Sequence, residues 1–335
     1  MQIKPDIIII SRTDSIGDVV LTLPMCGAIK EYFPKCKIIF LGNTYTLPVL
    51  KACTFVDEAI DWWTLKNLPE KAQIEEINRL NADCFIHVFP NKHLAQLIYK
   101  TKIKYRIATN RRIYNLFSCN KLVNLTRKNT NLHESQLNLK LLAPFGINIQ
   151  PELKEISRWY GLEKISESSK AKAFIKENKI NVILHPKSKG SAREWGLQNF
   201  NSLIRLLPNK IYNIIISGTE EEGKMFRNEL VINNEDITDV SGKLTLEEFI
   251  SLISYADVMV AASTGPLHIA AALGKKAIGL FAPMRPIFPT RWAPLGSDAH
   301  FLVKSSNCND CKKGSICHCI MEIEAKEVFQ IIKNA

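Results

Sequence analysis

The chain has 335 residues, of which 46% are hydrophobic and 23% charged, values typical of a globular protein rather than a disordered or fibrous one. Lysine and arginine exceed aspartate and glutamate by 11 charges, which favours an anionic partner such as a phosphorylated substrate, a lipid surface or nucleic acid. No run is apolar enough to span a bilayer and no signal peptide is recognisable, so with its scattered cysteines the chain is expected to be cytoplasmic.

Short apolar runs alternate with helical patterns through the first part of the chain. Strands are expected at 6–11, 37–42, 56–61, 83–89 and 102–108, and helices at 18–32, 69–80 and 133–143. This alternation is typical of a parallel sheet flanked by helices. Residues 1–150 are therefore predicted to form one domain.

The same alternation restarts after a polar, proline-bearing stretch at 151–168, which is the expected linker. Strands are expected at 179–185, 211–217, 237–240, 257–261 and 276–281, and helices at 197–207, 220–232, 245–255, 265–273 and 324–333. Residues 169–335 are predicted to form a second α/β domain. Two such domains predict a ligand cleft between them, at the carboxyl ends of their strands.

A polar loop at residues 12–18 joins the first strand to the first helix. Asp18 is expected either to stabilise the start of this helix or to act as a general base for an incoming hydroxyl. Asp14 is a second candidate base by residue type. The loop has one glycine and the chain has no nucleotide phosphate-binding loop, which argues against a nicotinamide oxidoreductase and against an NTPase.

A strand, a small-residue turn and a helix with marked ends meet at residues 256–274. Thr264 or Gly265 is the expected N-cap, Pro266 suits the first turn, and Gly274 is a typical helix stop. The start of this helix is either an ordinary cap or an anion site, because its free N–H groups and positive dipole end attract negative charge.

Two further loops follow predicted strands. In the first, Ser188, Lys189 and Arg193 would surround an anion with a hydroxyl and two cations, although a polar loop anchored by Trp195 is the alternative. In the second, Glu221 could accept hydrogen bonds from ribose hydroxyls, or could simply favour the first turn of a helix.

A basic stretch runs from Cys84 to His133, where ten lysines and arginines occur without a single aspartate or glutamate. It is predicted to form an anion-binding surface. A membrane surface and a phosphorylated acceptor both suit this charge, whereas nucleic acid is less favoured because no basic groove-binding helix or stacking motif accompanies it.

Four cysteines lie close together near the carboxyl end of the sequence: Cys308, Cys311, Cys317 and Cys319. They could hold a structural zinc ion, remain reduced thiols or form a disulfide. The tight spacing of the second pair does not match a usual zinc knuckle.

Taken together, these motifs resemble glycosyltransferase family 9, the heptosyltransferases of bacterial lipopolysaccharide synthesis. The Ser-Ile-Gly-Asp loop is similar to the family's strand–loop–helix, whose proposed catalytic aspartate corresponds to Asp18. The run beginning at Ser263 is similar to the family's (Asp/Asn)-(Ser/Thr)-Gly-x-x-His motif, which assigns the donor to Ser263, Thr264, Gly265 and His268. The resemblance also implies that Ser188, Lys189 and Arg193 hold the donor diphosphate and that Glu221 holds its ribose.

The resemblance implies a GT-B fold, with two Rossmann-like domains whose parallel sheets face a central cleft. It implies an inverting, metal-independent transfer of heptose from ADP-heptose, with no cofactor, to a lipid-anchored, phosphorylated core oligosaccharide at the cytoplasmic face of the inner membrane. The acceptor and the anionic membrane surface are assigned to the basic stretch, in particular Lys100, Lys102, Lys104, Arg106, Arg111 and Arg112. Nucleic acid is not an expected partner.

Two positions depart from the family pattern, because Ser263 replaces the usual aspartate or asparagine and Arg193 replaces a frequent lysine. A glycosyltransferase of the same fold with a different nucleotide-sugar is therefore an alternative. A non-catalytic basic protein that binds anionic glycan or nucleic acid is an alternative of another class.

Overall fold

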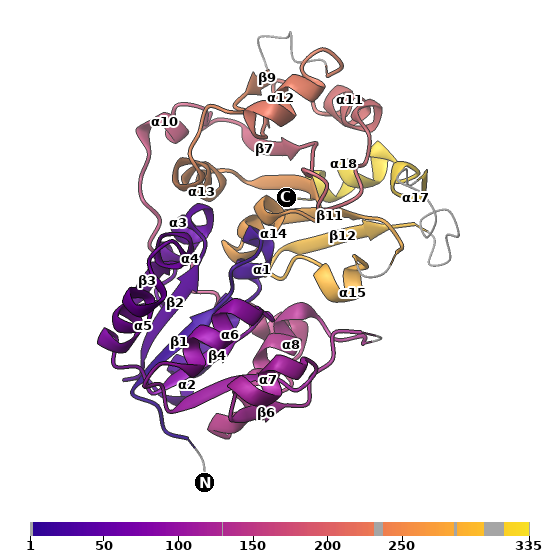
Figure 1. Ribbon diagram of the computed structural model, residues 1–335. Helices are drawn as coiled ribbons and strands as arrows, with labels where there is room; N and C mark the ends of the chain where they lie inside the picture. Colours follow the sequence, from indigo (N-terminus) through magenta and orange to yellow (C-terminus); the bar gives the residue numbers. More distant parts are fainter. Residues whose placement is uncertain (1–2, 129, 231–236, 285–286, 305–317, 335) are drawn as a thin grey trace. The chain divides into compact units, whose positions relative to one another are not determined.

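The computed structural model describes residues 3–128, 130–230, 237–284, 287–304 and 318–334 (Figure 1). The chain divides into two compact units, Met1–Lys164 and Ile165–Ala335, here called unit 1 and unit 2. Each unit contains a six-stranded parallel sheet. No helix within the described ranges is long and apolar enough to cross a membrane.

The sheet of unit 1 has the strand order β3-β2-β1-β4-β5-β6. Its strands are β1 (Ile7–Ser11), β2 (Lys37–Gly42), β3 (Glu58–Asp61), β4 (Cys84–His87), β5 (Tyr105–Thr109) and β6 (Lys121–Val123). Its α-helices are α1 (Ile16–Val20), α2 (Leu23–Tyr32), α3 (Leu47–Lys51), α4 (Trp62–Lys66), α5 (Glu70–Arg79), α6 (Lys92–Tyr99), α7 (Ile113–Ser118), α8 (Glu134–Leu139) and α9 (Leu153–Ile156). The 3₁₀ helices are η1 (Thr44–Thr46), η2 (Lys140–Phe145) and η3 (Ser157–Trp159).

The isoleucines of β1 are buried on both faces of this sheet. Ile9 belongs to a core shared with α4, α5 and α6, whereas Ile8 and Ile10 point to the opposite face and are fully buried there. Burial on both faces explains why the strand is an unbroken apolar run rather than an alternating one.

The single helix expected at 18–32 is two helices. α1 ends at Val20 and α2 starts at Leu23, with Pro24 in its first turn. A proline is favourable there because its missing N–H has no partner at a helix start, but it cannot continue a helix that precedes it.

Unit 1 extends into the segment that was expected to be a linker. α9 and η3 lie within 151–168, and the backbone of Trp159 in η3 packs so closely on α2 that a Cβ at Gly27 would lie 2.7 Å from the Trp159 Cα. Only a glycine permits this approach.

The sheet of unit 2 has the order β12-β11-β10-β7-β8-β9. Its strands are β7 (Ile180–His185), β8 (Tyr212–Ile216), β9 (Ile237–Asp239), β10 (Val258–Ala262), β11 (Lys276–Phe281) and β12 (Ala299–Val303). Its helices are α10 (Ser169–Lys172), α11 (Leu197–Leu206), α12 (Glu220–Phe226), α13 (Leu246–Tyr255), α14 (Gly265–Ala272), α15 (Pro289–Trp292), α17 (His318–Met321) and α18 (Ala325–Lys333). α12 ends at Phe226 rather than at the expected residue 232.

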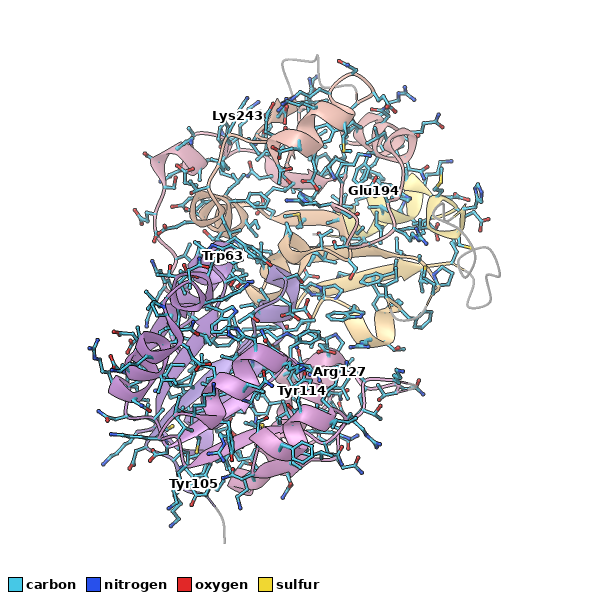
Figure 2. All side chains as sticks on the ribbon, viewed as in Figure 1. Trp63, Tyr105, Tyr114, Arg127, Glu194 and Lys243 are labelled. Atoms are coloured by element: carbon cyan, nitrogen blue, oxygen red, sulfur yellow. The ribbon has the colours of Figure 1, made fainter. Side chains whose placement is uncertain are left out.

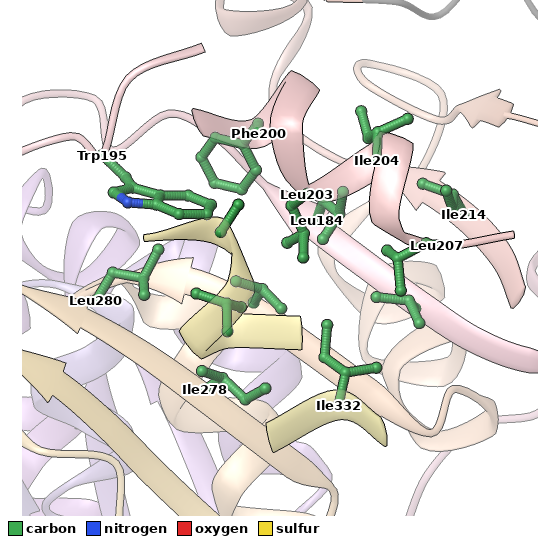
Figure 3. Close-up of a cluster of buried hydrophobic side chains, with 14 of the residues drawn as sticks. Leu184, Trp195, Phe200, Leu203, Ile204, Leu207, Ile214, Ile278, Leu280 and Ile332 are labelled. Atoms are coloured by element: carbon green, nitrogen blue, oxygen red, sulfur yellow. The ribbon is translucent and has the colours of Figure 1, made fainter. Parts of the chain in front are cut away.

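One face of this sheet carries the core drawn in Figure 3. Leu203 of α11 and Ile332 of α18 belong to it together with Leu280 of β11. Two helices that are far apart in the sequence therefore share one core. The rings of Trp195 and Phe200 pack edge to face, with their centroids 4.9 Å apart, and this contact anchors the start of α11 in the core.

Candidate functional site

Both sheets have the strand order of a Rossmann fold. The direction of winding reverses between β1 and β4 in unit 1 and between β7 and β10 in unit 2. Ligands of such folds bind beyond the carboxyl ends of the strands at this reversal. The loops that follow Ser11, His185 and Ala262 are therefore the positions at which a site is expected in each unit.

In unit 1, a buried guanidinium lies at this edge. The side chain of Arg12 is 2% exposed and donates hydrogen bonds to Asp14 at 2.7 Å, to Glu134 at 3.0 Å and to Asp18. Arg127, labelled in Figure 2, adds a second cation by donating to Glu134 at 2.9 Å. Neither Arg12 nor Glu134 was predicted from the sequence, although for Arg12 a charged residue directly after a buried strand is a usable signal.

The carboxylate of Asp18 is held through both of its oxygens. Arg12 contacts Oδ1, and the hydroxyl of Ser15 donates to Oδ2. Ser15 is the N-cap of α1 and Asp18 is its third residue, so Asp18 also faces the positive end of the helix. The structure thus gives Asp18 a fixed orientation and a helix-stabilising position together.

Asp14 accepts a hydrogen bond from the same guanidinium, but its environment differs from that of Asp18. Burial raises the pKa of its carboxyl from 3.8 to about 6, although the Arg12 charge acts in the opposite direction. Burial of this carboxyl therefore favours its protonated form.

In unit 2, the helix predicted to bind an anion starts with an unsatisfied hydroxyl. Thr264 is the N-cap of α14 and is 6% exposed, yet its Oγ1 makes no hydrogen bond with any part of the chain that the structure describes. An N-cap threonine normally accepts a hydrogen bond from the first turn. A buried polar group without a partner is costly, so this hydroxyl is suited to a ligand. Ser263 and Gly265 beside it are half-buried, and His268 is buried one turn later.

α14 is held in place by two close approaches to glycine. A Cβ at Gly279 would lie 3.0 Å from the Cδ2 atom of Leu267, and one at Gly296 would lie 2.2 Å from the carbonyl oxygen of Ala271. A larger residue at Gly296 would displace the backbone of α14, and with it the Thr264 hydroxyl.

The loop after β7 gives its three predicted residues different roles. Ser188 is buried and its hydroxyl donates to the Ala192 carbonyl at 2.8 Å, so it shapes the loop. Lys189 is exposed and adopts a left-handed backbone (φ 49°), and Arg193 is half-buried. Glu194, labelled in Figure 2, accepts a hydrogen bond from Lys187 at 2.9 Å.

Glu221 lies in the first turn of α12 and is exposed. Its pKa is lowered because its own backbone N–H and the Thr219 hydroxyl donate to the carboxylate, and because Lys189 contributes a positive charge nearby. Glu222 rather than Glu221 forms the capping box with Thr219, and the Glu221 carboxylate is exposed and keeps acceptor positions for a ligand beside these two hydrogen bonds.

The predicted donor residues of unit 2 thus follow β10, β7 and β8, which are neighbouring strands of one sheet. The structure brings them to a single edge, where hydroxyls, cations and a helix N-terminus lie together. Such a set can hold a diphosphate and the ribose next to it.

The six basic residues assigned to the acceptor are not brought together. Arg111 and Arg112 follow β5 and lie at the carboxyl edge of unit 1, where the Arg12 cluster is found. The others precede or begin β5 and lie at the opposite edge: Lys100, Lys102, Lys104 and Arg106. Lys100 forms a salt bridge with Glu70 at 2.7 Å, and Arg106 donates to the Ser118 carbonyl at 2.8 Å.

Of the four clustered cysteines, Cys308, Cys311 and Cys317 lie outside the described residues. Cys319 is buried in α17 as part of the unit 2 core. Among the residues with described positions, no group of three or more histidine, cysteine, aspartate or glutamate side chains has an arrangement that could hold a metal ion.

The sequence model of glycosyltransferase family 9, the heptosyltransferases, matches residues 73–320. The chain belongs to glycosyltransferase family 9. A Haemophilus influenzae protein described as a glycosyltransferase is 27% identical to it over 303 residues, which are 88% of this chain and 87% of that protein. Lipopolysaccharide heptosyltransferase 3 of Escherichia coli is 24% identical, over 83% of this chain and 84% of the relative.

Two solved structures share the fold of this family 9 enzyme. E. coli ADP-heptose lipopolysaccharide heptosyltransferase II has a TM-score of 0.75 and 16% identity, over 100% of this chain and 98% of that one. A family 9 glycosyltransferase of Veillonella parvula has a TM-score of 0.77 and 17% identity, with the same coverage. The predicted family, the GT-B fold and the assignment as a glycosyltransferase are confirmed.

Proposed function

We propose that this family 9 enzyme transfers heptose from ADP-heptose, with inversion at the anomeric carbon, to a lipid-anchored, phosphorylated core oligosaccharide of lipopolysaccharide. The observation that carries the donor part is the Thr264 hydroxyl at the start of α14, which has no hydrogen-bond partner among the described residues, together with the cationic loop after β7. The names of its relatives support the choice of sugar and acceptor.

For the donor, we assign the diphosphate to Thr264, the Gly265 N–H and the two cations Lys189 and Arg193. When the bond to the anomeric carbon breaks, negative charge grows on the departing ADP. Preorganised cations and a helix N-terminus stabilise that charge without a cofactor. Glu221 accepts hydrogen bonds from the ribose hydroxyls, Ser188 keeps the loop in shape, and Ser263 and His268 line the same edge.

For the acceptor, we assign the general base to Asp18. Its carboxylate takes the proton of the acceptor hydroxyl as that oxygen forms the new bond to the anomeric carbon. Arg12 and Ser15 hold both carboxylate oxygens, so one orientation is selected before the acceptor arrives. Arg111 and Arg112, at the same edge of the sheet, are suited to the phosphates of the acceptor.

Isothermal titration calorimetry with ADP-heptose, GDP-mannose and UDP-glucose tests the donor. We expect ADP-heptose to bind at least about tenfold more tightly than the other two. Mass spectrometry of a de-acylated core oligosaccharide, incubated with enzyme and donor, then tests transfer. Tight binding to a duplex oligonucleotide without nucleotide-sugar binding would contradict the proposal and favour a basic binding protein.

Ser263 favours one alternative donor. Where the family usually has a carboxylate or an amide, this chain has a short hydroxyl with fewer hydrogen-bonding atoms. Preferential binding of a GDP- or UDP-sugar in the same titration would identify a glycosyltransferase with a different donor.

A further inference from the structure

The polarity of helix α7 is the reverse of that of an ordinary surface helix. Its polar residues Asn115 and Ser118 are 1% and 5% exposed, whereas Ile113, Leu116 and Phe117 are 76%, 50% and 79% exposed. These three apolar residues are spaced at i, i+3 and i+4, so they lie on one outward face. Exposed apolar faces of this kind mark interaction surfaces.

The buried polar residues show that this orientation is specified rather than accidental. The Asn115 amide donates to the Thr109 carbonyl at 2.9 Å, which ties α7 to the end of β5. The Ser118 hydroxyl donates to the Tyr114 carbonyl at 2.8 Å, and Arg106 donates to the Ser118 carbonyl. Turning the apolar face inward would break the hydrogen bonds that Asn115 makes to Thr109 and that Arg106 makes to Ser118, because these two bonds join α7 to β5.

Cations flank the apolar face and no carboxylate accompanies it. Arg111 and Arg112 directly precede α7, and Lys121 follows it by three residues. Within the described ranges none of these three forms a salt bridge, and the Arg111 guanidinium donates a hydrogen bond to the Asn124 amide oxygen at 2.8 Å. Tyr99 belongs to the neighbouring helix α6 and is 57% exposed. Its ring packs against the guanidinium of Arg106 and adds an aromatic group next to α7.

We propose that the face of α7 formed by Ile113, Leu116 and Phe117 docks on an anionic phospholipid bilayer. Apolar side chains enter the boundary between headgroups and acyl chains, while adjacent arginines pair with the lipid phosphates. The cations on either side of α7 complement an anionic lipid surface. The proposal deepens the proposed function, because an enzyme with a lipid-anchored acceptor gains from a bilayer contact.

The test is flotation of the whole protein with vesicles that contain no acceptor. One vesicle is phosphatidylcholine alone and the other contains about 25% phosphatidylglycerol, an anionic lipid. We expect binding to the anionic vesicles, and a loss of at least about tenfold in the variant Ile113→Ser/Phe117→Ser. The variant Arg111→Ala/Arg112→Ala should lose affinity for the anionic vesicles and depend less on salt.

The matched control is Ile211→Ser/Met225→Ser, which removes two exposed apolar side chains of unit 2 and should float like the wild type. Wild-type binding by the Ile113→Ser/Phe117→Ser variant would overturn the proposal. A wild-type dimer that this variant converts to monomer would overturn it too, since the face would then bind a second copy. Transfer to a de-acylated acceptor should be unchanged in this variant, so a failure of docking is distinguishable from a failure of the proposed reaction.

Discussion

The guanidinium of Arg12 holds the carboxylate of Asp18, the proposed general base, while it is itself buried among the carboxylates of Asp14 and Glu134. The proposed catalytic loop and the core of unit 1 therefore share one charged group.

Replacing Arg12 by methionine should strongly destabilise unit 1. The variant would leave buried carboxylates with less compensation, and removing one partner of a buried ion pair costs about 3–5 kcal/mol. The measurement is urea unfolding. The control is Arg79→Met, which breaks an exposed salt bridge to Glu76 and should cost less than about 1 kcal/mol. Equal unfolding midpoints for the two variants would contradict the structural role of Arg12.

Replacing Asp18 by asparagine should abolish most transfer and leave donor binding nearly unchanged. The amide keeps the size of the side chain but cannot take a proton, and loss of a general base lowers the rate by roughly 10²–10⁴-fold. Initial rates and calorimetry on one preparation separate these effects. Asp14→Asn is the matched control on the same guanidinium. If the Asp14 variant were inactive and the Asp18 variant active, the base would be Asp14.

Asp14 should make stability depend on pH between about 4 and 6. Its pKa in the folded protein is about 6, above the value of 3.8 expected when unfolded, so folding favours the protonated form. This stabilisation is complete below pH 3.8 and is lost as the pH rises through 6. Between pH 5 and pH 8 its loss amounts to about 1 kcal/mol. Urea unfolding of the wild type and of Asp14→Asn between about pH 5 and pH 8 measures this loss, because the variant has no titrating carboxyl at position 14. If the free energies of unfolding of the two proteins changed in parallel with pH, Asp14 would not be the source of the pH dependence.

Thr264 and Thr245 allow a paired experiment on two N-cap threonines. The Thr245 hydroxyl accepts a hydrogen bond from the Glu248 N–H at 3.2 Å and caps α13, whereas that of Thr264 is unsatisfied. Thr245→Val should therefore cost about 1 kcal/mol of stability and leave donor affinity intact. Thr264→Val should cost little stability and weaken ADP-heptose binding by roughly tenfold, and Thr264→Ser should restore it. An unchanged affinity in Thr264→Val would remove this hydroxyl from the donor site.

Much of the fold could be predicted from the sequence because its strands are apolar runs bounded by polar residues. The run at Ile7–Ser11 and the one at Val258–Ala262 are examples, since strands buried on both faces have no competing pattern. β12 was missed because it lies at the sheet edge, where Phe301 is exposed and the other four residues are half-buried, so Ala299–Val303 lacks a continuous apolar signal.

The site was less predictable, because its chemistry depends on groups that are distant in the sequence. Arg12 meets Glu134, which is 122 residues away, and no local pattern pairs them. Whether an N-cap hydroxyl is satisfied, as in Thr245, or open, as in Thr264, depends on tertiary packing. The reversed polarity of α7 was also invisible, because the spacing of Ile113, Leu116 and Phe117 is the spacing of an ordinary core-facing helix.

The shared core of α11 and α18 has a consequence for the order in which the chain folds during synthesis. All six strands of unit 1 have been made once Val123 is complete, so its sheet can assemble early. The core of unit 2 includes Val328 and Ile332, and it stays open until they leave the ribosome. Until then Leu203 and Leu280 are exposed to other chains and to chaperones. The proposed nucleotide half of the enzyme thus acquires its native shape after unit 1.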